Sequence, residues 1–510
     1  MSSPTVPGDR VSRNAGFALL AQIAGAVFTG GLTIFLARAL TEEQYGHFTF
    51  GMSVLMIASM FADFGIASST GRFIAERRHD RAGAATVFRT GLGLKVLAGL
   101  TASLALAALA GPICAAFGAP GATWVLRALA VSLFGQTVFL LLLGGFIALG
   151  VVRWNAVLAT IESFVETLSA VALVLFGAAA LGAALGRATG YLVGVAVGLA
   201  IASRVIGSLR RPAARSAVER LEATAAQPLV TPRMILTYAG PLVLVDAAFR
   251  VFASIDVLLI AAIVGAGAPV AAYGLAMQLT LFLEYPGAAM ASAVAPRLAR
   301  APGTAAGAGA DSLDLFTRSV RYLVILQVLL AAPLVIWPEA IVDLLFGDKY
   351  GDVPAVLLAL VPYVLLSGIA QITTLGVNYL GEARRRVPIA VAMLSVNIAV
   401  ALVLLPRIGI VGAAIGTSVA YAIWVPGHVW ILHRRIGFEL RPLLVTAARA
   451  CAAGAAMIGT LALIGTGAVS FPLMLLGAVV GPVVYVAALF ALRELTPRDF
   501  AVVRAALARR

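Results

Sequence analysis

Apolar stretches of about 20 residues follow one another along nearly the whole chain. A helix needs about 20 mostly apolar residues to cross the hydrocarbon core of a bilayer, and fourteen stretches reach that length. Hydrophobic residues make up 61% of the 510 positions, so these stretches are expected to span a membrane. The sequence predicts an all-α, polytopic membrane protein with about 14 transmembrane helices.

Two motifs recur about 230 residues apart. Tyr45-Gly46 aligns with Tyr273-Gly274 at almost the same offset as a longer pair, Gly182-Ala183-Ala184-Leu185-Gly186 with Tyr191 and Gly412-Ala413-Ala414-Ile415-Gly416 with Tyr421. A repeat of this kind predicts two pseudo-symmetric six-helix lobes, which leaves two helices at the C-terminal end. Two like lobes that rock around a shared site are typical of transporters.

The predicted lobes and connecting segments follow a simple order. The parts are a cytoplasmic tail (1–14), an N-lobe of six spans (15–206), a cytoplasmic linker (207–235), a C-lobe of six spans (236–432), two further spans (443–492) and a cytoplasmic tail (493–510). The first residues are polar and do not form a cleavable signal, so the first span is expected to be retained.

Positive charge alternates with the predicted spans. Most of the 37 Lys and Arg residues fall in segments on one side, whereas the outer loops hold Arg38, Lys349 and Arg407. The positive-inside rule therefore places both termini in the cytoplasm. Topology and anionic membrane lipids explain the net charge of +14, so no nucleic-acid partner is expected.

The cysteines and histidines do not have the spacing of a metal site. Cys114 and Cys451 fall near opposite ends of the predicted topology, so neither a disulfide nor a two-cysteine metal site is expected. His428 and His433 lie near the inner end of one span and are expected to form an interfacial pair. The sequence thus predicts no metal and no cofactor.

Enzymatic and nucleotide-driven functions find little support in the sequence. Lys95 and Lys349 are the only lysines, and neither belongs to a Gly-rich phosphate loop. A membrane polymerase or ligase usually needs a sizeable outer loop with polar catalytic residues, and the predicted outer loops are short. We therefore expect a protein that is not an enzyme, with the polymerase or ligase as the alternative from another class.

Span seven carries the charges of greatest interest. A charge at bilayer depth costs at least ~2.5 kcal/mol, so it requires a partner or a watery cavity. Asp246 and Arg250 lie one turn apart on one helical face. One interpretation is a structural ion pair, and the other is that Arg250 binds a lipid diphosphate while Asp246 holds its geometry. Asp256, nearer the outside, is a further substrate-binding candidate.

Four carboxylates are candidates for coupling transport to a proton or sodium ion. Glu162 and Glu166 share one face of span five, where two like charges favour proton binding; alternatively, Glu162 meets Arg153 and water. Asp63 in span two and Glu284 near the middle of span eight could each bind a coupling cation. The alternative for these two is a carboxyl group that stays neutral or pairs with an arginine such as Arg250.

The remaining polar residues within spans allow two roles. The amides of Asn378, Asn397 and Gln371 are candidates for sugar contacts, and hydrogen bonding between helices is the alternative. Lys95 and Arg127 lie nearer to the ends of their spans, so both are expected to extend toward the membrane interface.

Several short motifs resemble one family along nearly all of the chain. The sequence is similar to the polysaccharide and O-antigen flippases of the multidrug/oligosaccharidyl-lipid/polysaccharide exporter superfamily. The similarity lies in the order and spacing of Leu36-Ala37-Arg38 with Tyr45-Gly46, Asp63-Phe64-Gly65 before Arg72, Ile255-Asp256, Tyr273-Gly274, Leu345-Phe346-Gly347 with Tyr350, and Asn397 leading to Pro406, Gly409 and Gly412-Ala413-Ala414.

The resemblance implies a function in the inner membrane. A member would move an oligosaccharide linked to undecaprenyl diphosphate, such as an O-antigen, exopolysaccharide or capsule repeat unit, to the outer leaflet, and span seven would line its central cavity. Polysaccharide polymerase or assembly proteins are further possible partners. The alternatives within the superfamily are a multidrug exporter and a peptidoglycan-lipid exporter. Peptidoglycan-lipid flippases usually carry several arginines in the first two spans, whose apolar parts hold none here.

Overall fold

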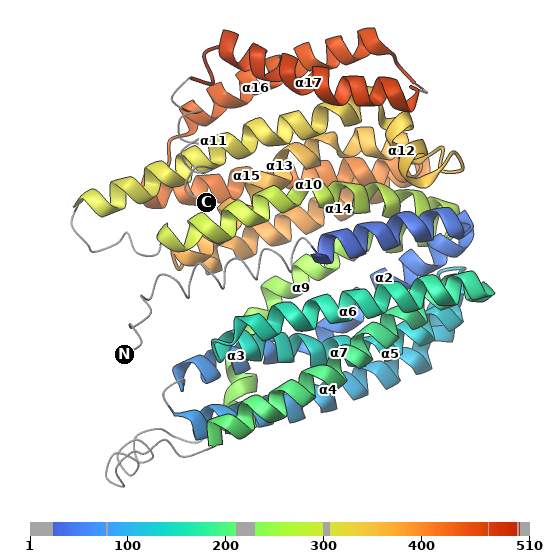
Figure 1. Cartoon of the computed structure of the whole chain (residues 1–510), viewed down its shortest axis with the longest axis vertical. Coiled ribbons are helices and arrows are strands. Elements are labelled where there is room, and N and C mark those ends of the chain that lie inside the picture. Colours follow the sequence, from blue (N-terminus) through green and yellow to red (C-terminus); the bar gives the residue numbers. More distant parts are fainter. Residues whose placement is uncertain are drawn as a thin grey trace, which may run out of the picture. The chain divides into compact units, whose positions relative to one another are not determined.

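The computed structural model describes residues 24–77, 80–210, 230–298, 306–467, 469–496 and 499. All regular secondary structure in these residues is helical (Figure 1). The predicted all-α fold class is therefore confirmed. The chain forms two compact units, Met1–Ala271 and Ala272–Arg510, and each is described by itself.

The first unit is built from long antiparallel helices. An apolar helix over Ala24–Ala39 comes first. It is followed by α2 (Glu42–Asp63), α3 (Ile66–Glu76), α4 (Arg81–Ala116), α5 (Thr123–Ala148), α6 (Val152–Leu173), α7 (Ala179–Arg210) and α9 (Pro232–Ile263). Phe88, Leu142, Phe146 and Leu158, from α4, α5 and α6, form part of its buried apolar core.

Helix α9, which corresponds to the predicted seventh span, packs against α2, α3 and α4 within this unit. The close approach explains the Tyr45-Gly46 motif near the start of α2. A Cβ atom on Gly46 would lie only 2.0 Å from the carbonyl oxygen of Gly267, just beyond α9. A residue with a side chain would force the two segments apart.

Helix α2 has defined signals at both ends. Thr41 and Gln44 form a capping box, in which each side chain bonds the other residue's backbone N–H at 3.2 Å. The helix ends where Phe64 (φ 42°) and Gly65 (φ 66°) adopt left-handed backbone conformations. The sequence predicts one continuous span over 47–70, but the structure breaks it here into α2 and α3, which leaves Asp63 at a helix end.

The second unit is also a helical bundle. Its helices are α10 (Ala268–Leu298, beginning at the boundary), α11 (Ala306–Ile336), α12 (Pro338–Phe346), α13 (Val353–Tyr379), α14 (Arg386–Ile408), α15 (Ile410–Ile436), α16 (Leu440–Ile464) and α17 (Phe471–Ala491). The α14–α15 hairpin packs against α13, and α16 packs against both α11 and α17. The last two helices thus attach to the unit through α11.

The repeated glycines occupy similar places in two helical hairpins. In α6–α7, a Cβ on Gly182 would lie 3.0 Å from the backbone of Leu173, and one on Gly186 would lie 2.4 Å from Ala170. In α14–α15, the corresponding Cβ on Gly412 would lie 2.7 Å from the backbone of Leu404. In both units the motif therefore allows the second helix of a hairpin to approach the first. Superposition of whole lobes stays a prediction.

Many of the described helices meet the requirements of a membrane span. Ten described segments are long and apolar enough to cross, and one of them, Arg153–Val205, contains both α6 and α7. The shorter helix Ala24–Ala39 overlaps the predicted first span. These helices agree with a multi-pass membrane protein, while the count of fourteen and the lobe boundaries stay predictions.

Candidate functional site

Helices α2, α4 and α9 bring four polar side chains together inside the first unit. Lys95 Nζ donates to the carboxylate of Asp63. Arg250 donates from Nη1 to Ser59 Oγ at 2.7 Å, and its Nη2 lies 3.5 Å from Asp63 Oδ2. We call Ser59, Asp63, Lys95 and Arg250 the Arg250 cluster. Two cations in it share one carboxylate, so its charge is positive.

The Arg250 cluster joins positions that are far apart in the sequence. Asp63 is placed by the end of α2, and its side chain keeps 24% of its surface exposed. The Arg250 side chain keeps 25%, whereas Lys95 keeps only 1%. The expectation that Lys95 reaches the interface is wrong, because a carboxylate within reach compensates the ammonium where it is buried.

Asp246 and Asp256 are the other two substrate-binding candidates on α9. Asp246 lies in the helix, but the side chains of 238–246 are outside the described residues, so its pairing with Arg250 stays a prediction. Asp256 is buried, with 4% of its surface exposed. The observed carboxylate beside Arg250 is Asp63, which the sequence offered as one alternative.

A second polar cluster joins α6 and α7. Arg187 Nη1 lies 2.9 Å from Glu166 Oε1, and its Nη2 donates to the hydroxyl of Tyr191 at 3.3 Å. Glu162 is buried and accepts a hydrogen bond from Ser163 at 3.2 Å. Arg187 was not predicted as a site residue, because helix periodicity does not show which acid faces it across the α6–α7 hairpin.

The second unit holds a carboxylate with a different environment. Glu284 of α10 accepts hydrogen bonds from the Tyr363 hydroxyl and from Gln371 Nε2 at 3.3 Å, both on α13. The ring of Tyr363 meets that of Tyr421 edge to face, with centroids 4.5 Å apart. We call Glu284, Tyr363, Gln371 and Tyr421 the Glu284 cluster. Its described contacts to Glu284 come from neutral groups.

Two amides proposed for sugar contacts lie in helix packing. Asn397 is fully buried, and a Cβ on Gly416 would lie 2.8 Å from its Oδ1. Asn378 accepts a hydrogen bond from Arg386, which also donates to His428 Nε2 at 3.1 Å. The Asn378 contact joins two helices, whereas neither amide atom of Asn397 has a hydrogen-bond partner among the described residues. A sugar contact for either amide stays a prediction.

The expected interfacial histidine pair does not form. His428 is fully buried between Arg386 and the carbonyl of Trp424, whereas the exposed His433 contacts the carbonyl of Phe438. Five residues of helix turn the two rings to different faces, which explains the error. Within the described ranges, no group of three or more His, Cys, Asp or Glu side chains could hold a metal ion.

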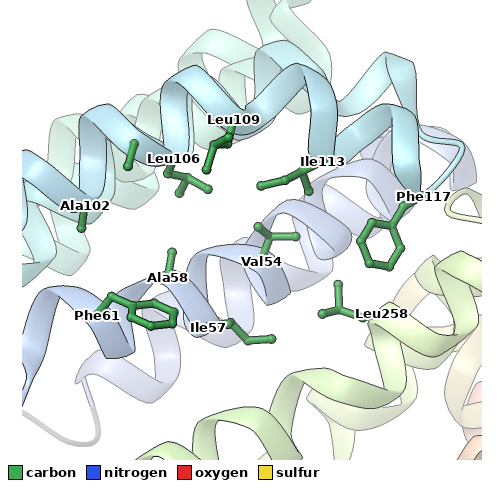
Figure 2. Close-up of a pocket in the computed structure, with 11 residues that line it drawn as sticks. Val54, Ile57, Ala58, Phe61, Ala102, Leu106, Leu109, Ile113, Phe117 and Leu258 are labelled. Atoms are coloured by element: carbon green, nitrogen blue, oxygen red, sulfur yellow. The ribbon is translucent and has the colours of Figure 1, made fainter.

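An apolar groove of about 360 Å³ lies beside the Arg250 cluster on the same three helices. Figure 2 shows side chains from α2 and α4 pointing into one open space, with Leu258 of α9 at its edge. Phe61 and Ala102 line one end, and Phe117 lies toward the other. All eleven lining residues are apolar.

The sequence can be assigned to a family. A sequence profile described as "Polysaccharide biosynthesis protein" matches residues 11–301, more than half of the chain. The chain belongs to this polysaccharide biosynthesis family. The predicted family relationship is therefore confirmed. No match was found among curated proteins.

Solved structures establish the fold of this family member. The lipid II flippase MurJ in an inward closed conformation matches with a TM-score of 0.70 at 12% identity, over 94% of this chain and 99% of that one. An inward-facing MATE multidrug transporter of the MOP superfamily matches with a TM-score of 0.60 at 16% identity, over 81% and 95%. An outward-facing MATE transporter of the same superfamily gives 0.60 at 15%, over 84% and 96%. The chain therefore has the polytopic fold of these transporters.

Proposed function

We propose that this polysaccharide biosynthesis family member is a flippase. It moves an oligosaccharide linked to polyprenyl diphosphate across the bacterial inner membrane by alternating access. Sugars and phosphates cannot cross hydrocarbon unaided, because their polar groups lose hydration without replacement partners. The protein supplies those partners, while the polyprenyl chain stays in an apolar environment.

The observation that carries this proposal is the Arg250 cluster. Arg250 lies within an apolar helix, yet a quarter of its side chain is exposed, and Ser59 and Asp63 hold its guanidinium in place. A guanidinium is permanently charged and its planar fork matches phosphate oxygens. With Lys95 beside it, the cluster retains positive charge after Asp63 is counted. A diphosphate has the opposite charge and would pair with these cations.

Transport of a fluorescent polyprenyl-diphosphate oligosaccharide in vesicles of phosphatidylethanolamine and phosphatidylglycerol tests the proposal. The fraction reaching the other leaflet is measured with a membrane-impermeant quencher. We expect Arg250→Leu to transport at the rate of protein-free vesicles and Arg250→Lys to recover part of the activity, since Lys keeps the charge without the bidentate geometry. Arg318→Leu, which removes an exposed pair with Asp314, is the matched control.

A purely structural role for Arg250 predicts another result. If it only neutralises Asp246, the double change Arg250→Leu with Asp246→Leu restores transport. Normal transport by that double variant would refute the role in substrate binding.

The Glu284 cluster supports a coupling role. Among the four candidate carboxylates, Asp63 and Glu166 form ion pairs with cations, whereas the hydrogen bonds described for Glu284 come from Tyr363 and Gln371. A carboxylate among neutral donors can bind a proton or sodium ion without displacing a resident cation. Rates measured under a proton gradient and then under a sodium gradient identify the ion.

A multidrug exporter is the second candidate, because the Glu284 cluster combines an acid with aromatic rings. Such a site suits an organic cation. Uptake of tetraphenylphosphonium in the same vesicles separates the two: saturable uptake that Glu284→Gln abolishes would favour the multidrug function. We expect no such uptake.

The proposed membrane orientation is tested by labelling. Single cysteines are introduced after Cys114 and Cys451 are replaced by serine. An impermeant thiol reagent should label Ala116→Cys and Thr466→Cys on intact cells and should leave Ser216→Cys unlabelled. Labelling at position 216 would overturn a topology with both termini inside.

A further inference from the structure

The apolar groove and the Arg250 cluster follow one another along the same helices. On α4, Lys95 and Ala102 are seven residues apart, which places them on one face and about 10 Å apart along the axis. On α2, Ala58 lines the groove, and Ser59 follows it in the sequence on a different face of the helix. On α9, Leu258 lies eight residues beyond Arg250, or about 12 Å. Along α4 and α9 the groove lining thus begins about 10–12 Å from the charged residues of the cluster.

The two parts have opposite chemistry. At one end, two cationic side chains share one described carboxylate and retain positive charge. Beyond it, the lining is apolar, with the partly exposed Phe61 and Leu109 on opposite sides. A molecule that matches both parts has an anionic head and a hydrocarbon chain. An organic cation would meet repulsion at the charged end.

We propose that the groove binds the polyprenyl chain of the lipid-linked substrate while the Arg250 cluster holds its diphosphate. The inference rests on the proposed function and adds a binding site for the chain to it. The groove extends about 22 Å from Ala102 to Phe117, at the helical rise of α4. Its volume is at the lower end of the range for ligand pockets, so it takes a segment of the chain and excludes the sugars.

The predicted orientation agrees with a substrate taken from the cytoplasmic leaflet. Helix α2 is expected to run from outside to inside, which puts Asp63 in the inner half of the bilayer, and the groove extends from there to Phe117 at the outer end of α4. A lipid in the cytoplasmic leaflet has its phosphate and chain in this same order. Transfer of the chain from lipid to groove exchanges one apolar environment for another. The groove therefore sets the position of the chain, and the charges supply most of the affinity.

Cross-linking tests the groove directly. Wild-type protein in phosphatidylethanolamine and phosphatidylglycerol vesicles is irradiated with a sugar-free polyprenyl diphosphate that carries a diazirine on its chain, and labelled peptides are identified by mass spectrometry. We expect labelling on the groove faces of α2 and α4, near Phe61 and Leu109. Unlabelled polyprenyl diphosphate should suppress it, and additional phosphatidylglycerol should not. Equal suppression by phosphatidylglycerol would make the groove a site for bilayer acyl chains and overturn the proposal.

A groove-filling variant gives the second measurement. Ala102→Trp places a large ring in the groove, and Ala108→Trp adds the same ring to an exposed position of α4 outside the lining. We expect Ala102→Trp to lower labelling and the rate of oligosaccharide transport by about tenfold, while Ala108→Trp stays near wild type. Wild-type labelling remains decisive if Ala102→Trp does not fold.

The outcomes separate the groove from the proposed function. If wild type transports the oligosaccharide but shows no specific groove labelling, the groove proposal fails and the flippase stands. If groove labelling is specific but wild type does not transport, the flippase proposal fails and the chain site stands. Transport and labelling by Ala102→Trp at wild-type levels would also overturn the groove proposal.

Discussion

The Arg250 cluster and the Glu284 cluster each hold a carboxylate among apolar helices, and they differ in the groups that contact it. Asp63 lies between two cations, whereas Glu284 receives hydrogen bonds from a tyrosine and a glutamine. The first arrangement keeps fixed charges and has positive charge left for an anion. The second keeps one acid whose charge can change. The proposed headgroup site and the proposed coupling site therefore differ in their chemistry.

Removal of Asp63 should have the largest effect. Asp63→Leu leaves the buried ammonium of Lys95 without its carboxylate, and a broken buried pair costs about 3–5 kcal/mol in the free energy of unfolding. Glu284→Gln should cost far less, because an amide can still bond to its neutral partners. Denaturant unfolding in detergent measures both. The double change Asp63→Leu with Lys95→Leu should recover most of the loss, and equal losses for Asp63→Leu and Glu284→Gln would remove the distinction.

Glu284→Gln should have the next largest effect, and this effect is on transport. If Glu284 carries the coupling ion, Glu284→Gln should lower gradient-driven transport to the rate measured without a gradient. Exchange without a gradient should continue, since the Arg250 cluster is intact. Rates with and without an imposed gradient provide the measurement. A variant that keeps its gradient dependence would assign coupling to another carboxylate, with the buried Glu162 next to be tested.

Helical hairpins provide a smaller contrast between the units. In Gly186→Ala the new methyl meets the backbone of Ala170 at 2.4 Å, so we expect a loss of about 1–3 kcal/mol from overpacking. In Gly416→Ala it meets a side-chain atom of Asn397 at 2.8 Å, and the loss should be smaller. Gly144→Ala, which has open space, is the control and should be neutral or slightly stabilising. Equal unfolding energies for all three would show that the repeated glycines do not set the hairpin spacing.

The smallest effect concerns the end of the second unit. Burial raises the pKa of Asp499, but hydrogen bonds from Tyr322 and Thr496 and the charge of Arg321 outweigh it and lower the pKa to about 2. Because the ordinary value is 3.8, this group stabilises the fold above about pH 4, and the contribution is lost as the pH falls toward 2. Unfolding temperatures between pH 5 and pH 3 should fall less in Asp499→Asn than in wild type. Parallel curves would contradict this role.

Hydrophobic length and repeated motifs were sufficient to predict an all-helical membrane protein, and the resemblance of ordered short motifs predicted its family. A bilayer imposes these features residue by residue, because each span must be apolar over a set length and must satisfy its own backbone. The repeated glycines were readable as a repeat, but their close approach to a neighbouring helix came only from the structure, because other glycines such as Gly144 have open space around them. The helix break at Phe64 and Gly65 could not be predicted from the sequence, because apolar residues continue on both sides of it.

Partners of the polar residues depended on tertiary structure. Arg250 and Asp63 were both candidates from sequence, yet their contact joins positions 187 residues apart. Lys95 and Arg187 were missed as partners, because the cost of a buried charge depends on which acid lies opposite, and helix periodicity describes neighbours on one helix only. The groove likewise is formed by three helices, α2, α4 and α9, that are not consecutive in the sequence. Local chemistry dictates which segments enter the membrane, and packing decides which charges can remain there.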